Sequence, residues 1–458
     1  MKLALVFPRM IHPSGDPPLG IAYIAAYVKK HTKSQVSIID TTFHPSFDYV
    51  KEQLEKLKPE LVGISTDTLM YNNTVRIAKI AKNLGITVAI GGPHASILPE
   101  TLKDYADIIV IGEGEETFKE LVLAFEKKKK DFSKIKGIWY KNNNIWWKNI
   151  ARKSIENLDQ FEFPVFHMLE MNKYFNLWHS LDCINPKLKG TNIIASRGCP
   201  YNCSYCQPTL KKIFGNKYRI RSPENVVAEL KELKKRYGIN AFFLHDDTFT
   251  IYKDWVKKFC DLLKKEKLKF LWSCNSRINN LKDKEMLKFM HESGLRMIHI
   301  GIESGSQRIL DEIYNKGIKI SDVQKVIDSA KDIGIKTLAF FMLGAPGETE
   351  KEIKQTIKFA VSLNATEITA TITTPLPGTK LYDMIKDKYK ISDNFADFDY
   401  YNKRAFEDPK LSYKKLKKYQ RQLLFRFYIH PKRWGYIAKH LLTLKGWKKM
   451  ILKIGRFL

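Results

Sequence analysis

Residues 197–208 read RGCPYNCSYCQP and place three of the chain's six cysteines within eight positions, as Cys199-x3-Cys203-x2-Cys206. Three thiolates cannot complete the four-ligand shell of a structural zinc ion, and no further Cys or His follows at finger-like spacing. Three cysteines can, however, hold three irons of a [4Fe-4S] cube and leave the fourth iron open. An open iron is a ligand site, so this spacing predicts a reactive iron-sulfur centre.

The other three cysteines, Cys183, Cys260 and Cys274, are scattered, and we expect them to be structural rather than part of a disulfide framework. No apolar run approaches the ~20 residues of a membrane span, and the opening MKLALVFP does not read as a secretory signal. We therefore expect a cytoplasmic, reducing compartment. A 458-residue chain that is 44% hydrophobic predicts two or three domains, and its net charge of +29 predicts an anionic partner.

Residues 1–130 alternate short apolar runs with amphipathic stretches five times, beginning with KLALVF and LGIAYIAAYVKKH. This alternation predicts a doubly wound, Rossmann-like parallel α/β sheet, whose ligands bind beyond the carboxyl ends of the strands. No G-x-G-x-x-G turn follows the first strand, which argues against a nucleotide. Small and hydroxyl residues at the strand ends suit either tight turns or the close approach of a large flat ligand. These candidates are Pro18, Leu19, Gly20, Ser65, Thr66, Thr68, Gly91, Gly92, His94, Gly112, Glu113, Gly114 and Glu115.

Residues 131–189 show little periodicity and predict a connector with room for one hairpin. Across 190–390, six strand-like runs recur at helix-sized intervals, namely TNIIAS, AFFLH, KFLWS, MIHIGI, TLAFFML and EITATI. This pattern predicts a partial (β/α)6 barrel related to the TIM barrel, with the cysteine loop at the end of its first strand.

Polar residues and a glycine turn follow the next four strands of this predicted barrel. Each has an ordinary structural interpretation as a helix cap or a loop, but their order at successive strand ends favours one shared site. The guanidinium of Arg277 suits a carboxylate, which it can pair at two points. In chain order the candidates are Asp246, Asp247, Asn275, Arg277, Glu303, Ser304 and Gly344.

The cysteine motif, with Tyr205 before its last cysteine, resembles the signature of the radical S-adenosylmethionine (SAM) superfamily. The resemblance implies a [4Fe-4S] cluster on Cys199, Cys203 and Cys206, and SAM that is cleaved to a substrate-activating radical. It also implies an electron donor such as ferredoxin or flavodoxin, anaerobic chemistry, and SAM-binding roles for Tyr205 and the seven candidates above.

The motifs PPLG, GGPHA and GEGE resemble the N-terminal domain of cobalamin-binding radical SAM enzymes, so the resemblance implies cobalamin at the candidates of the first domain. One departure matters. Classical cobalamin domains carry an axial histidine in D-x-H-x-x-G, whereas here Asp40 is followed by Thr41 and Thr42, and His44 comes two places late. We therefore predict cobalamin without imidazole on cobalt; a vestigial domain without cobalamin is the alternative.

Residues 391–458 form a predicted basic helical region. From Tyr401 onward the chain has 17 Lys or Arg and two acidic residues, a local net charge of +15. Apolar residues recur from Ile437 to Leu458 at spacings of three, four or seven, which predicts a basic amphipathic helix on an anionic membrane. A helix docked on the barrel is the alternative, and nucleic acid is not favoured because no RNA-binding signature is present.

Taken together, the resemblance implies an enzyme. The function that we expect is a cobalamin-dependent radical SAM methyltransferase acting on an unactivated carbon of a lipid-like or other small-molecule substrate. A radical SAM cyclase or carbon-carbon coupling enzyme without methyl transfer is the second hypothesis. An electron-transfer or structural iron-sulfur protein is the third.

Overall fold

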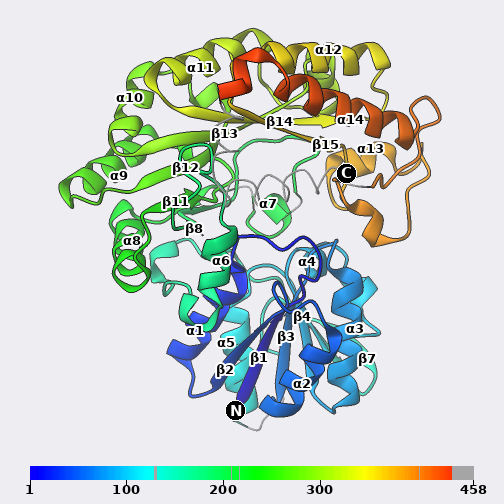
Figure 1. Cartoon of the computed structure of the whole chain (residues 1–458). Helices are drawn as coiled ribbons and strands as arrows, with labels where there is room; N and C mark the ends of the chain where they lie inside the picture. The colour runs from blue at the N-terminus through cyan, green and yellow to red at the C-terminus, as the bar shows by residue number, and fades with distance from the viewer. Residues whose placement is uncertain (128–130, 208, 216, 402, 436–458) are drawn as a thin grey trace. The chain divides into compact units, whose positions relative to one another are not determined.

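The computed structural model describes residues 1–127, 131–207, 209–215, 217–401 and 403–435 (Figure 1). These residues fall into two compact units. Unit 1 consists of Met1–Asn176, Gln207–Arg219 and Asn394–Ala396. Unit 2 consists of Leu177–Cys206, Ile220–Asp393 and the chain from Asp397 onward.

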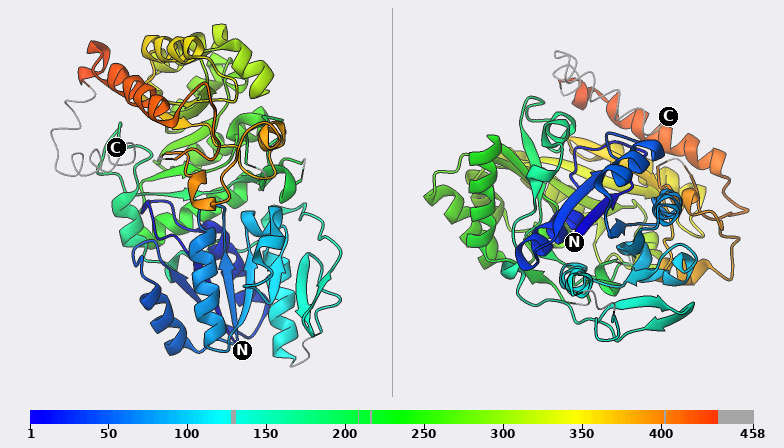
Figure 2. Two further views of the ribbon diagram at one scale, coloured as in Figure 1. Left: turned by 90° about the vertical axis from the view of Figure 1, so that its right-hand side faces the viewer. Right: turned by 90° about the horizontal axis from the view of Figure 1, so that it is seen from below.

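Unit 1 contains a seven-stranded sheet in the order β2-β1-β3-β4-β5-β6-β7. The parallel strands are β1 (Lys2–Phe7), β2 (Gln35–Asp40), β3 (Leu61–Ser65), β4 (Thr87–Gly91) and β5 (Ile108–Val110). The helices are α1 (Leu19–His31), α2 (Phe47–Leu57), α3 (Tyr71–Asn83), α4 (Pro93–Ile97) and α5 (Glu115–Glu126). Since right-handed crossovers send α1 and α2 to opposite faces, α1 packs against α5 and α2 against α3 (Figure 2). The doubly wound sheet is confirmed.

A hairpin extends this sheet beyond β5. Strands β6 (Ile138–Asn142) and β7 (Ile145–Lys148) pair with each other, and β6 pairs with β5, all antiparallel. The turn residues Asn143 and Asn144 have φ angles of 48° and 63°. Two consecutive positive φ angles are typical of a tight hairpin turn, and Asn tolerates them better than most residues.

Unit 2 contains a six-stranded parallel sheet in the order β15-β14-β13-β12-β11-β8. Its strands are β8 (Gly190–Ile193), β11 (Ala241–Leu244), β12 (Leu271–Ser276), β13 (Leu295–Glu303), β14 (Lys336–Leu343) and β15 (Glu367–Ile372). Between the successive strands lie α8 (Pro223–Tyr237), α9 (Lys253–Lys265), α10 (Lys284–Glu292), α11 (Ile320–Ile333) and α12 (Glu350–Ser362). Two short strands, β9 (Ser196–Arg197) and β10 (Arg219–Ile220), form a separate sheet. The partial barrel is confirmed.

The basic C-terminal region begins with a helix that belongs to the barrel. Helix α14 (Tyr413–Tyr428) packs against β15 and α12 and buries Leu416, Leu423 and Phe427 (Figure 1). The Gln420 side-chain amide donates to the Ala370 carbonyl of β15 (2.8 Å). The amphipathic helix expected from Ile437 to Leu458 lies outside the described residues. Within the described part, no helix is long and apolar enough to cross a membrane.

The packing of α14 predicts a contrast between two nearby phenylalanines. Phe427 is fully buried, whereas Phe425 is 67% exposed. Phe427→Ala should lower the free energy of unfolding by about 3–5 kcal/mol because it opens a cavity, and Phe425→Ala should change it by less than about 0.5 kcal/mol. Urea unfolding of the two variants measures this difference. Equal effects would contradict the docking of α14 on the barrel.

Candidate functional site

The three cysteines of the motif lie on the loop that follows β9. Cys199 is buried, and Cys203 and Cys206 are partly exposed. The loop is fixed by backbone contacts: Ser204 N donates to the Tyr314 carbonyl (2.9 Å), and the Ser204 carbonyl accepts from Leu381 N (2.9 Å). The loop therefore presents its thiols from a braced backbone.

These thiols fit an iron-sulfur cluster by their chemistry. The pKa of Cys206 is raised to about 12. Burial is the largest cause, and the negative charges of Asp247, Cys203 and Cys199 also contribute. The thiolates therefore repel one another, and a cationic iron core would relieve that repulsion. Among the described residues, no three His, Cys, Asp or Glu side chains already converge as a ligand set, so the thiols would have to reorient around a cluster.

Arg277 contacts the cysteine loop directly. Its Nη1 donates to Cys203 Sγ (3.1 Å), its Nη2 donates to the Lys316 carbonyl, and its guanidinium lies 3.8 Å from the centre of the Tyr201 ring. The sequence led us to expect a carboxylate partner for Arg277. In the structure Arg277 is oriented toward the cysteine loop through Cys203, and a carboxylate partner for it stays a prediction.

A network of three side chains lies behind the loop. Tyr205 OH donates to Glu303 Oε1 (2.9 Å), and Lys316 Nζ donates both to Tyr205 OH (2.7 Å) and to Glu303 Oε1 (2.8 Å). Glu303 and Lys316 are buried. A Cβ atom on Gly301 would lie 2.3 Å from Glu303 Oε1, so a side chain at this position would displace the Glu303 carboxylate. Lys316 is not among the residues predicted from the sequence, because a single lysine in a loop gives no indication of its partners.

The two adjacent aspartates differ in role. Asp246 is buried, and its Oδ1 accepts from Ala195 N (2.8 Å) and Ser196 N (2.7 Å), while its own carbonyl accepts from the Asn275 amide (2.9 Å). Burial raises the pKa of Asp246 to about 7. Desolvation and the neighbouring Asp246 raise the pKa of Asp247 to about 7, although the Asp247 side chain stays partly open to solvent. Asp246 and Asn275 thus brace the strand ends, and Asp247 remains accessible to a ligand.

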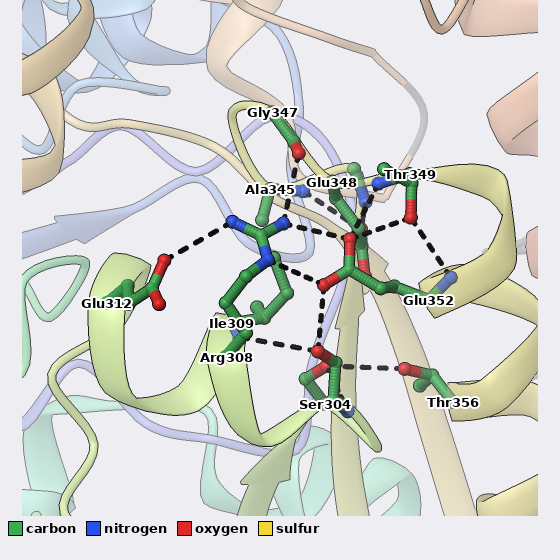
Figure 3. A network of polar contacts seen from close by, with 12 residues as sticks. Ser304, Arg308, Ile309, Glu312, Ala345, Gly347, Glu348, Thr349, Glu352 and Thr356 are labelled. Atoms are coloured by element: carbon green, nitrogen blue, oxygen red, sulfur yellow. Dashed lines mark hydrogen bonds and ion pairs between the residues drawn. The ribbon is translucent and has the colours of Figure 1, made fainter.

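Ser304 belongs to a second braced region, shown in Figure 3, and Gly344 precedes Ala345 of that region. Ser304 Oγ lies 3.2 Å from Thr356 Oγ1. Gly344 N donates to Glu348 Oε2 (2.6 Å), as does Ala345 N (3.1 Å). Burial raises the pKa of Glu348 to about 8. The turn after β14 is therefore closed around a buried, protonated carboxyl group.

The second carboxyl group of this region, that of Glu352, is paired with an arginine. Arg308 donates from Nε and Nη2 to the two oxygens of Glu352, each at 2.8 Å, and these bonds lower the pKa of Glu352 to about 2. Glu352 also accepts from Thr349 at the start of α12, in a capping box. The segments that follow β13 and β14 are therefore cross-linked by an ionised pair.

In unit 1, several candidate residues interlock at the ends of β3 and β4. Thr66 N donates to the Gly91 carbonyl (2.9 Å), and the Thr66 carbonyl accepts from His94 N (3.1 Å). Gly92 has a φ angle of 98°, and a Cβ there would lie 2.8 Å from the Thr66 carbonyl oxygen. Ser65 ends β3, and Thr68 follows it. The sheet edge thus brings these predicted residues together.

The remaining candidates of unit 1 lie at the starts of α1 and α5. Gly20 is exposed at the beginning of α1, after Pro18 and Leu19, which are buried. Before α5, Gly112 N donates to Ser96 Oγ (3.0 Å), and a Cβ on Gly114 would lie 2.8 Å from Ile24 Cδ1. Glu115 is buried in the first turn of α5.

His94 is an internal residue. It is buried, its ring nitrogens lie 3.3 Å from Thr68 Oγ1 and 3.1 Å from Thr101 Oγ1, and the ring of Phe395 packs edge-on against it (4.8 Å between centroids). Burial lowers the pKa of His94 to about 4, so its ring is neutral at pH 7. Its hydroxyl partners hold it within unit 1.

Two further acidic and basic groups of unit 1 are already paired. Glu113 forms a buried ion pair with Arg219. His44 Nε2 lies 2.7 Å from Glu170 Oε2, and its ring stacks on Tyr49 (4.5 Å). These contacts turn His44 toward Glu170, and cobalamin without imidazole on cobalt stays a prediction.

The comparisons with known proteins match both units. The model of the radical SAM superfamily matches residues 193–360, and that of the B12 binding domain matches residues 15–122. A Pyrococcus horikoshii protein named "uncharacterized methyltransferase PH0819" is 35% identical over 94% of this chain and 93% of its own length. This chain belongs to the cobalamin-binding radical SAM family. It is therefore an enzyme whose family cofactors are a [4Fe-4S] cluster, SAM and cobalamin.

Other members of this family perform different reactions on the same fold. An anaerobic magnesium-protoporphyrin IX monomethyl ester cyclase of Rubrivivax gelatinosus is 32% identical over 84% of this chain and 68% of its own length. The structure of the radical SAM methyltransferase TsrM from Kitasatospora setae superposes with a TM-score of 0.69 at 18% identity, covering 84% of this chain and 75% of that chain. This likeness shows the shared fold.

Glu348 and Glu352, both drawn in Figure 3, have pKa values that are shifted in opposite directions. This difference predicts a pH effect on stability. The pKa of Glu348 is about 8 in the folded chain, above its ordinary value of 4.5, so its contribution is present at low pH and is lost as the pH rises toward 8. Glu348→Gln should remove a slope of up to about 1.4 kcal/mol per pH unit between pH 5 and 8. Urea unfolding across that range measures it.

Glu352→Gln is the matched control for this experiment. The pKa of Glu352 is about 2, so it is ionised throughout the range and its replacement should leave the slope unchanged. A Glu348→Gln protein with the full slope of the parent would show that Glu348 is already ionised when folded.

Proposed function

We propose that this chain is a cobalamin-dependent radical SAM methyltransferase that transfers a methyl group to an unactivated carbon of a small-molecule substrate. The observation that carries the proposal is the braced loop with Cys199, Cys203 and Cys206 in a chain that also contains the cobalamin-binding fold. The methyltransferase name of the P. horikoshii relative, which aligns over nearly the whole chain, supports methyl transfer. A lipid-like substrate belongs to the same proposal.

The proposal assigns roles to several candidate site residues of unit 2. The three cysteines would hold the cluster, which together with SAM would supply a radical, while cobalamin would supply the methyl group. Asp247, the open carboxylate, would accept from the methionyl amine of SAM. Glu303 and Tyr205, fixed by Lys316, form the wall that receives the nucleoside, and Ser304 and Gly344 complete it. An electron donor such as ferredoxin or flavodoxin provides the electron.

The proposal for unit 1 places cobalamin at the carboxyl edge of its sheet. The loops at this edge are closely interlocked, and Gly92 and Gly112 have positive φ angles of 98° and 87°. A Cβ on Gly112 would meet nothing within 4 Å, so the backbone there can face a flat ligand, whereas Gly92 lets the loop approach Thr66 closely. Because His44 is paired with Glu170, cobalamin would bind with no imidazole on cobalt.

Cyclisation or coupling without methyl transfer is the second candidate, favoured by the identity to the R. gelatinosus cyclase. The two reactions differ in their products from SAM. A methyltransferase yields S-adenosylhomocysteine beside 5′-deoxyadenosine, and only with cobalamin present. A cyclase yields 5′-deoxyadenosine alone.

The function predicts a specific response to loss of the three cysteines. Anaerobically reconstituted protein should hold about four irons per chain and, when reduced, cleave SAM. Replacing Cys199, Cys203 and Cys206 together by Ala should abolish both properties, and chromatography of the products should show neither nucleoside. Cys260→Ala, a buried cysteine of α9, is the matched control and should retain both. SAM cleavage by the triple variant would contradict the assignment.

An anionic membrane is the proposed surface on which the enzyme works. Phe425, Ile429 and Trp434 are 67%, 48% and 62% exposed at the end of α14 and just beyond it. Lys418 and Arg426 are exposed on the same helix. Aromatic and basic side chains together suit the headgroup region of an anionic leaflet.

This surface predicts salt-sensitive binding to anionic vesicles but not to neutral ones. Replacing Phe425, Ile429 and Trp434 together by Ala should weaken sedimentation with phosphatidylserine vesicles severalfold, because the apolar contact is lost. Replacing Ile145 and Trp147 of β7, which are 61% and 53% exposed, is the matched control and should have no effect. Unchanged binding by the triple variant would refute the role of this surface.

A further inference from the structure

The segment Gln207–Arg219 begins directly after Cys206, the last cysteine of the motif, yet it belongs to unit 1. Its end is fixed by a two-point ion pair: Arg219 Nη1 lies 2.9 Å from Glu113 Oε2, and Arg219 Nη2 lies 3.1 Å from Glu113 Oε1. The two side chains are only 3% and 4% exposed. Glu113 lies in the loop between β5 and α5, at the sheet edge that carries the candidate cobalamin residues.

Backbone groups from two other stretches complete this pair. Ile155 N donates to Glu113 Oε2 (3.2 Å), and the Ile155 carbonyl accepts from Arg219 Nη1 (2.5 Å). Arg219 Nη2 also donates to the Phe214 carbonyl (3.5 Å) within its own segment. The pair therefore joins the loop after β5, the chain at residue 155 and the segment that follows Cys206.

A second buried pair fixes the chain two residues later. Arg221 pairs with Glu229 of α8, with side chains 5% and 1% exposed. Arg221 Nη1 and its backbone N also donate to the carbonyls of Ile194 and Ala195, both at 2.8 Å. The chain leaves unit 1 between Arg219 and Ile220, so each side of this junction is held by its own buried Arg-Glu pair.

Buried ion pairs are a poor source of stability, because desolvation offsets most of the attraction, but they specify position well. Lys217 of the same segment forms a contrasting pair with Glu156, 2.7 Å apart, with side chains 70% and 68% exposed. Exposed pairs of that kind contribute little. We therefore assign Arg219 and Glu113 a role in positioning the chain rather than in stabilising the fold.

We propose that the Arg219-Glu113 pair is a positioning element that couples cobalamin binding at the edge of unit 1 to the segment that follows the cluster cysteines. A ligand that contacts the loop of residues 112–115 orders Glu113, and Glu113 orders Arg219 and the segment that Arg219 ends. Coupling of this kind is reciprocal, so a loosened segment lowers the affinity for cobalamin. The inference rests on the proposed function in that it requires cobalamin as a ligand.

Hydrogen exchange of the full-length protein, with and without hydroxocobalamin, tests the coupling. In the parent protein, peptides that cover residues 209–219 should exchange severalfold more slowly once cobalamin is bound. The double variant Glu113→Gln/Arg219→Met removes both charges together and leaves no buried charge unpaired. It should lose this protection while its absorption spectrum still shows bound cobalamin, with affinity reduced by up to about tenfold.

Lys217→Met is the matched control, since it removes a cation of the same segment from an exposed pair, and it should keep the full protection. If the double variant does not fold, Arg219→Lys replaces it, because lysine keeps the charge but cannot form the two-point contact. It should lose most of the protection.

The outcomes separate this inference from the proposed function. Parent protein that binds cobalamin with no change in exchange at 209–219 overturns the coupling and leaves the function intact. Full protection in the double variant, or in Arg219→Lys, also overturns it. Parent protein that binds no cobalamin overturns the cobalamin-dependent function and the coupling together.

Discussion

Thiolates held close together repel one another, and in the proposed enzyme the loop from Cys199 to Cys206 would carry three of them. Several groups of unit 2 contact this loop and hold it in place. Arg277 donates to Cys203, backbone contacts of Ser204 fix the loop, and Tyr205 is tied to Glu303 and Lys316. The parallel strands supply the frame, because all of their carboxyl ends lie at one edge. A cluster bound there meets a prearranged set of charges rather than a flexible loop.

The same logic separates residues that can meet a ligand from residues that support them. Asp246, Glu348 and His94 are buried, and each is held by short polar contacts within its own unit. Asp247 stays open beside Asp246. Adjacent residues of one motif can thus differ in their exposure to a ligand, and Glu113 of the GEGE motif is buried in its pair with Arg219.

The local pattern of the sequence was sufficient for the fold. Apolar runs predicted the strands from β1 to β5, β8, and those from β11 to β15, since buried strands of parallel sheets read as short hydrophobic segments. The two-residue strands β9 and β10 were not predicted. The cysteine spacing and the polar residues at strand ends also predicted a site at the carboxyl edge of the barrel strands. Leu416, Leu423 and Phe427 recur at helical spacing and face the barrel in α14, whereas the surface helix predicted from Ile437 to Leu458 lies outside the described residues.

Contacts between distant residues were beyond prediction from the sequence. Arg219 and Glu113 are 106 positions apart, and Phe395 packs on His94 from the other end of the chain. Periodicity reports only which face of an element is apolar, so it cannot reveal these partners. Lys316 was missed for the same reason, because its partners Tyr205 and Glu303 are placed by the fold.

The central claim is that three cysteines hold a cluster whose fourth iron binds SAM. Electron-nuclear double resonance of the reduced, reconstituted enzyme with SAM labelled with nitrogen-15 in its amino group tests this claim most directly. We predict a hyperfine coupling between the labelled nitrogen and the cluster, which requires direct coordination to the open iron. A cluster signal that SAM leaves unchanged, with no nitrogen-15 coupling, would contradict the account.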